Sequence, residues 1–119
     1  MELRHFTFSE FDSPDSPGSG EKYMDREFLE MLDEARHLAG IQFKITSGYR
    51  TKKHNAKVGG VSVSSHLIGR AADIWCEHTG KRWQIISACM EAGFSRIGIA
   101  KNFIHVDNDD QKPDAIWLY

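Results

Sequence analysis

The sequence contains only two cysteines and three prolines, and none of its apolar runs approaches the length of a membrane span. Cys76 and Cys89 are too few for a disulfide framework, so we expect free, buried thiols, with metal binding as the alternative. The net charge of -2 provides no basic surface of the kind that nucleic-acid binding requires. The first residues lack the apolar core of a signal peptide, which predicts a cytoplasmic location at synthesis or a mature form without its leader.

A chain of 119 residues with 40% apolar content is typical of one globular domain, and we expect a single domain over residues 1–119. Apolar residues recur at helical spacing over 25–39, where Gly40 is the stop signal, and over 81–92, where Thr79 is the expected cap. On the second helix we expect Trp83, Ile85, Ile86, Cys89 and Met90 to point inward. Strands are expected at 41–47, 71–76, 94–100, 102–107 and 115–119, with the third and fourth paired as a hairpin. Phe6, Phe8 and Phe11 predict a strand-like stretch that anchors the N-terminus by its rings.

Residues 47–74 combine ligand-type side chains with glycines that allow tight turns. Thr51 is suited to cap a short helix that carries His54. Further on, Gly69 lies between His66 and Asp73, so the chain can turn after the histidine and present both side chains at one point. Imidazole and carboxylate together suit zinc. The sequence therefore predicts two ligands of a metal site.

A third ligand is needed, and His105 is the best candidate by strand parity. Residues 103, 105 and 107 share one face of the expected strand, so His105 and Asp107 lie together on a face that otherwise carries apolar side chains. Polar groups in that position need partners, and a metal would supply one. His54 is the competing third ligand. A serine nucleophile is not supported, because Ser64 precedes His66 in the chain and no base is indicated across space.

These motifs together resemble the M15 family of zinc D-Ala-D-Ala carboxypeptidases, in its short single-domain branch. That family includes peptidoglycan carboxypeptidases, dipeptidases and phage endolysins, and it shares its fold with the hedgehog signalling domain. The resemblance covers roughly residues 5 to 119. The motifs that carry it are Ser47-Gly48-Tyr49-Arg50, His54-Asn55, Val58-Gly59-Gly60, Ser64-x-His66-x-x-Gly69-x-Ala71-x-Asp73 and Phe103-Ile104-His105-Val106-Asp107.

The resemblance implies an α+β fold, with an antiparallel sheet and helices packed on one side. It implies that His66, Asp73 and His105 bind Zn²⁺, that Arg50 binds a substrate carboxylate, and that Ser64 lies close to the metal. Tyr49 and His54 are further candidates for substrate binding and for stabilising the developing oxyanion.

The chain departs from the family pattern at one catalytic position. Several branches place an acidic base three residues before the second histidine ligand, where this chain has Asn102. Asp107 is the acid left in reach, and we expect it to be the general base or, alternatively, to orient a ligand histidine.

The expected function is therefore zinc-dependent hydrolysis of peptide bonds in peptidoglycan stem peptides, of the D-Ala-D-Ala carboxypeptidase or L-Ala-D-Glu endopeptidase type. The alternative is a non-catalytic, zinc-stabilised module that binds a peptide or cell-wall fragment. We expect a monomer that acts on the bacterial cell wall as a phage lysin or an exported enzyme, with neither nucleic acid nor a membrane span involved.

Overall fold

The helix expected over residues 25–39 is α2 (Arg26–Ala39) in the computed structural model, which describes residues 2–119. The Asp25 carboxylate caps it by accepting a hydrogen bond from the Phe28 backbone N–H at 2.9 Å, and Gly40 ends it with a φ of +69°. Phe28, Leu29, Leu32 and Ala35 are fully buried on its inner face. The sequence prediction for this helix is confirmed, including both of its ends.

The second long helix, α4 (Thr79–Glu91), begins earlier than expected and has a different cap. His78, and not Thr79, caps it, because the His78 Nδ1 accepts hydrogen bonds from the backbone N–H groups of Gly80 and Lys81. The expectation that Trp83 and Met90 point inward is wrong, since their side chains are 72% and 47% exposed. Helical spacing identified an apolar stripe, but packing against α2 selected the face that carries Ile85 and Cys89.

Phe8 and Phe11 lie in a 3-10 helix, Phe8–Phe11, in place of the expected strand-like stretch. A capping box between Thr7 and Glu10 favours this turn over an extended chain. Phe6 and Phe11 are nevertheless buried and meet edge to face at 5.3 Å, so the rings anchor this segment as expected. The remaining short helices are α1 (Ser19–Tyr23), α3 (Lys52–Lys57) and the 3-10 turn Ser65–Ile68. Thr51 caps α3, as predicted.

Five strands form one sheet in the order β1-β2-β4-β3-β5. They are β1 (Ile45–Ser47), β2 (Ala71–Trp75), β3 (Arg96–Ile99), β4 (Phe103–Asp107) and β5 (Ala115–Leu118). The first strand is shorter than the expected 41–47. The β3–β4 hairpin is confirmed, and the pairings among β1, β2, β4 and β3 are antiparallel. The last strand differs, because the loop 108–114 crosses β3 and returns to the same end of the sheet, so β5 pairs with β3 in parallel.

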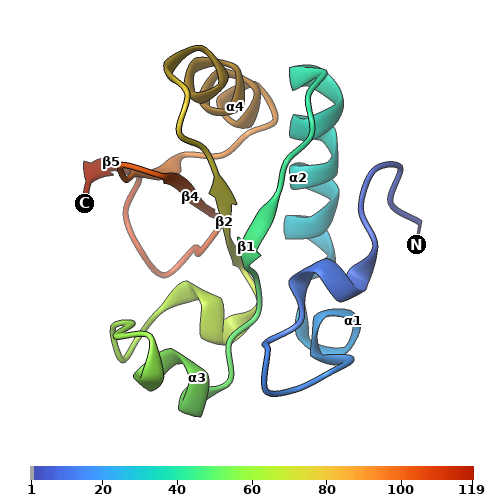
Figure 1. Ribbon diagram of the computed structural model, residues 1–119, viewed down its shortest axis with the longest axis vertical. Helices are drawn as coiled ribbons and strands as arrows, with labels where there is room; N and C mark the ends of the chain where they lie inside the picture. Colours follow the sequence, from blue (N-terminus) through green and yellow to red (C-terminus); the bar gives the residue numbers. More distant parts are fainter. Residues whose placement is uncertain (1) are drawn as a thin grey trace.

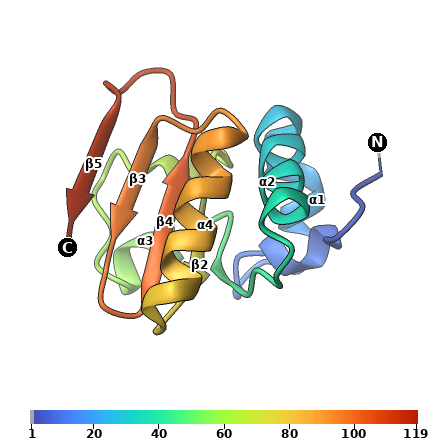
Figure 2. The same cartoon turned by 90° about the horizontal axis from the view of Figure 1, so that it is seen from above.

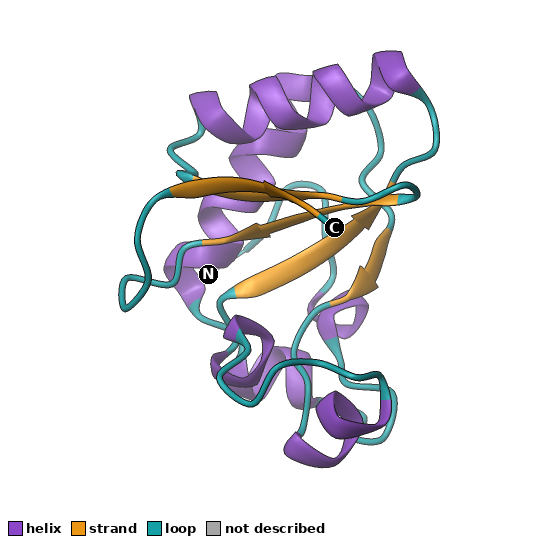
Figure 3. Cartoon of the chain, turned by 90° about the vertical axis from the view of Figure 1, so that its left-hand side faces the viewer, coloured by secondary structure: helices purple, strands orange, loops and turns teal. Residues whose placement is uncertain are grey.

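The two faces of the sheet have different roles because side chains alternate along each strand. Ala72, Ile74, Ile97, Ile104 and Val106 belong to one buried apolar cluster with the inner faces of α2 and α4. Figure 1 and Figure 2 show α2 and α4 side by side, and Figure 3 shows the sheet between the long helices and the loops beyond its other face. The alternate residues of the strands, among them Asp73 and His105, therefore point away from the apolar core.

Cys76 and Cys89 are free and buried, which confirms the prediction for both thiols. Burial raises the pKa of the Cys89 thiol to about 12. Among residues 2–119, none of the helices has the length and apolarity that crossing a bilayer requires.

Candidate metal centre

Asp73, His66 and His105 meet on the open face of the sheet. Asp73 and His105 face each other across the β2–β4 pairing, and His66 comes from the 3-10 turn that precedes β2. Ser64 sets that turn, because its hydroxyl accepts a hydrogen bond from the His66 backbone N–H at 3.2 Å. Gly69 then ends it with a φ of +71°, and a Cβ there would lie 2.1 Å from the Tyr23 carbonyl oxygen. The turn therefore depends on glycine at this position.

The distances among the three side chains fit a tetrahedral zinc ion. Asp73 Oδ1 lies 3.3 Å from His66 Nε2 and 3.0 Å from His105 Nδ1. Zinc bonds of about 2.0–2.2 Å put tetrahedral ligands roughly 3.3 Å apart. All three side chains are buried, and one ligand atom from each lies within 4.8 Å of the others. Two imidazoles and one carboxylate also match the donor set of zinc sites that keep a fourth position open.

Each candidate ligand has its remaining polar atom bound by the protein. His66 Nδ1 donates to the Gly48 carbonyl oxygen at 2.7 Å, which leaves Nε2 directed at Asp73. His105 Nε2 donates to Asp107 Oδ2 at 2.7 Å, which leaves Nδ1 directed at Asp73. Such contacts hold ligand rings in the orientation that a metal requires.

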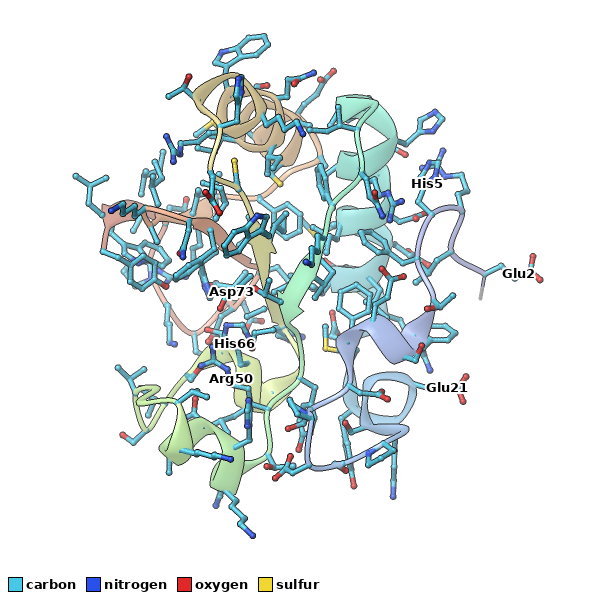
Figure 4. All side chains as sticks on the ribbon, viewed as in Figure 1. Glu2, His5, Glu21, Arg50, His66 and Asp73 are labelled. Atoms are coloured by element: carbon cyan, nitrogen blue, oxygen red, sulfur yellow. The ribbon has the colours of Figure 1, made fainter. Side chains whose placement is uncertain are left out.

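Arg50 holds the other oxygen of Asp73, with Nη2 at 3.3 Å from Oδ2. Its Nε donates to Ser47 Oγ at 2.9 Å, and its Nη1 donates to Asn55 Oδ1 at 3.2 Å. Figure 4 shows Arg50, His66 and Asp73 close together in the middle of the molecule. A guanidinium has five N–H donors, so two remain for a ligand at the mouth of the site.

The electrostatics of the cluster reflect burial and close pairing. Burial alone would raise the pKa of Asp73, but its hydrogen bonds to His105 and His66 outweigh burial and hold the pKa below its usual range. Burial alone would lower the pKa of His105, but its hydrogen bonds to Asp107 and Asp73 outweigh burial and raise that pKa. The site thus keeps the Asp73 carboxylate ionised beside two imidazoles. A metal is bound by an ionised carboxylate and by neutral imidazoles, so the site can bind one once the rings have lost their extra protons.

A cavity of about 380 Å³ opens onto the three side chains. Arg50 and Ser64 line it, as does Asp107. Tyr49 and His54 do not line it. The Tyr49 ring stacks on Tyr23 at 4.9 Å, and the His54 backbone N–H is bound by the Thr51 cap.

The further residues that line the cavity include four large side chains that sequence reasoning missed, Arg96, Lys112, Trp117 and Tyr119. Arg96 alternates with Ile97, which faces the core, so strand parity was the available signal for it. Trp117 lies between Ile116 and Leu118, which are both exposed, so its strand carried no such signal. Trp117 and Tyr119 lie over Gly98, where a Cβ would come within 2.7 Å of the indole. These residues lie near the candidate ligands because of the order and register of the strands. The sequence pattern does not contain that information.

Asp107 lies on the face of β4 predicted for it, but protein groups bind both oxygens of its carboxylate. Its side chain is 1% exposed and contacts the far nitrogen of the His105 ring, away from Asp73. Arg96 Nε donates to its other oxygen at 2.7 Å. Burial alone would raise the pKa of Asp107, but the hydrogen bond and charge of His105, the Asp109 backbone N–H and the charge of Arg96 together outweigh burial and lower that pKa. This arrangement favours the ring-orienting role over proton transfer. Asn102 is exposed in the β3–β4 turn.

The chain matches a known protein family over most of its length. A family model described as Peptidase M15 matches residues 4–107, which is most of the chain and includes all three candidate ligands. No curated protein matches the chain.

Proposed function

The chain belongs to the Peptidase M15 family, and from that premise we propose that it is a zinc-dependent metallopeptidase acting on peptidoglycan stem peptides. The D-Ala-D-Ala carboxypeptidase and L-Ala-D-Glu endopeptidase types both fit this proposal. The observation that carries it is the buried His66, Asp73 and His105 cluster at the floor of an open cavity. We further propose that it works as a monomer on the bacterial cell wall, as a phage lysin or an exported enzyme.

The chain's own residues divide the work of such a site. Zinc, when bound, supplies Lewis-acid polarisation of the scissile carbonyl and activation of water. His66, Asp73 and His105 are the residues that would hold it. Arg50 fixes Asp73 and keeps free N–H donors for a substrate carboxylate, which a planar guanidinium binds in bidentate fashion. Ser64 holds the turn that presents His66.

A second candidate function is a zinc-stabilised binding module that cuts nothing. One observation favours it: among the described residues that line the cavity, the carboxylates are Asp73 and Asp107, and both are bound by protein groups. Neither is free to accept a proton from a water molecule in the cavity.

Purified zinc-loaded protein, incubated with peptidoglycan and with defined muropeptides and followed by mass spectrometry, separates the two functions. The peptidase hypothesis predicts new hydrolysis products that disappear with a chelator and return when zinc is restored. The binding hypothesis predicts zinc-dependent retention on peptidoglycan with unchanged peptide masses. If zinc produces neither products nor retention, both functions are excluded.

A further inference from the structure

Arg96 lies next to the metal ligands without contacting them. It is the first residue of β3 and stands opposite Asp107 in the β3–β4 register. Its Nε donates to Asp107 Oδ1 at 2.7 Å, its Nη1 donates to the Pro113 carbonyl oxygen, and its guanidinium lies 4.9 Å from the centre of the Trp117 ring. These contacts leave 12% of the Arg96 side chain exposed, and Arg96 is one of the residues that line the cavity.

Asp107 connects Arg96 to His105. Its Oδ2 accepts from His105 Nε2 at 2.7 Å, and its Oδ1 accepts both from Arg96 and from the Asp109 backbone N–H at 3.1 Å. Three donors around one carboxylate fix its orientation. The carboxylate in turn fixes the imidazole, because a ring bound at Nε2 can present only Nδ1 to Asp73.

We propose that Arg96 is a positioning residue for the metal, acting through Asp107 on His105. This inference rests on the proposed function in one respect, that the cluster binds zinc. An arginine is suited to the task because its rigid fork holds the carboxylate and the Pro113 carbonyl at the same time. A carboxylate buried as deeply as Asp107 also needs a charged partner to stay in place. Without Arg96, Asp107 is held by fewer donors, and the His105 ring loses its fixed direction.

A purely structural role makes a different prediction. Arg96 also ties the loop 108–114 to β3 through Pro113, and it contacts β5 through Trp117. If that were its whole contribution, its loss would lower the stability of the fold and would add independently to any effect of removing Asp107.

The test is a double-mutant cycle read as zinc affinity, measured by competition with a chromophoric chelator on full-length protein. Its variants are Arg96→Gln, Asp107→Ala and the double variant. Residues that support a ligand typically contribute about 10–100-fold to metal affinity. We expect Arg96→Gln alone to weaken zinc binding within that range. In the Asp107→Ala background we expect Arg96→Gln to change affinity by less than about twofold, because the connection is already broken.

Two further variants keep the test interpretable. Arg36→Gln is the matched control, since the Arg36 guanidinium also lies over an aromatic ring, that of Phe6 at 4.8 Å, far from the cavity. It should leave zinc affinity unchanged. Arg96→Lys retains the charge but not the fork, so it serves if Arg96→Gln folds poorly by circular dichroism, and it should also weaken zinc binding. The visible spectrum of Co²⁺-loaded protein should change with Arg96→Lys and not with Arg36→Gln.

Unchanged zinc affinity in folded Arg96 variants, or an Arg96→Gln effect of full size in the Asp107→Ala background, would overturn the proposal. Wild-type protein that binds zinc but cleaves no muropeptide would count against the peptidase function and leave this inference standing. Wild-type protein that binds no zinc would overturn both.

Discussion

Removing zinc should lower the melting temperature of this protein without unfolding it. The apolar cluster between the sheet and helices α2 and α4 excludes the metal ligands, so the core does not depend on the metal. Without zinc, the Asp73 carboxylate still pairs with both imidazoles. We therefore expect a folded metal-free state, in contrast to small zinc domains that unfold when the metal is removed.

The size of the effect follows from mass action. A ligand that binds only the folded state stabilises it by about 2.7 kcal/mol when its free concentration is 100 times the dissociation constant. For a domain of this size, each kcal/mol shifts the midpoint by roughly 3–5 °C. Free zinc at that ratio should therefore raise the melting temperature by about 8–13 °C above that of chelator-treated protein.

The assay is thermal unfolding with and without zinc for wild type, His105→Ala and His37→Ala, each compared with its own metal-free form. His105→Ala also removes one buried hydrogen-bond partner from each of Asp73 and Asp107, so its metal-free form should be less stable by about 1–3 kcal/mol. In His105→Ala, zinc should raise the melting temperature hardly at all. In His37→Ala, zinc should raise it as much as in wild type, because His37 is exposed. A full rise in His105→Ala, or no difference between loaded and chelated wild type, would refute the assignment of the site.

Three further outcomes are expected. Arg50→Lys keeps the charge but loses the planar fork whose free N–H groups are proposed to bind the substrate carboxylate, so the KM for peptides with a free carboxylate should rise about 10–100-fold, and unchanged kinetics would exclude the role. Because hydrogen bonds to Asp107 and Asp73 outweigh burial and raise the pKa of His105, its charged form stabilises the metal-free fold below the unfolded pKa of about 6.5, and that contribution is lost as pH rises through the folded pKa. Zinc needs the neutral ring, so affinity measured by competition should increase by about tenfold or more from pH ~6 to pH ~8, and equal affinities would contradict this. Cys76 and Cys89 should not react with an aromatic disulfide reagent until the protein is unfolded, since both are buried and burial raises the pKa of Cys89 to about 12.

Strand periodicity predicted the face on which each candidate ligand lies. On β4, the alternation of Ile104 and Val106 with His105 and Asp107 was readable from the sequence, and the structure has the same alternation. The helix over 25–39 was equally readable, because its apolar spacing and its terminal glycine agree with each other.

The details that were missed depend on which neighbour each residue meets. Parity placed Asp107 on the correct face but did not show that Arg96 stands opposite it, and that contact turns the carboxylate toward the far side of the His105 ring. Trp83 was expected inside because it is apolar, but α2 packs against another face of α4. Likewise His78 caps α4 with a ring nitrogen, a choice that residue preferences for helix caps do not anticipate.

The antiparallel pairing of β2 with β4 has a consequence for the lifetime of the folded state. It brings together Asp73 and His105, which are 32 positions apart in the chain, and helix α4 and strand β3 lie between them. Closing so long a loop is entropically costly, so we expect the complete ligand set to exist only late in folding. Interactions absent from the transition state change the unfolding rate and leave the folding rate almost unaffected. Zinc should therefore slow unfolding and prolong the lifetime of the folded state many-fold, while refolding proceeds at its metal-free rate.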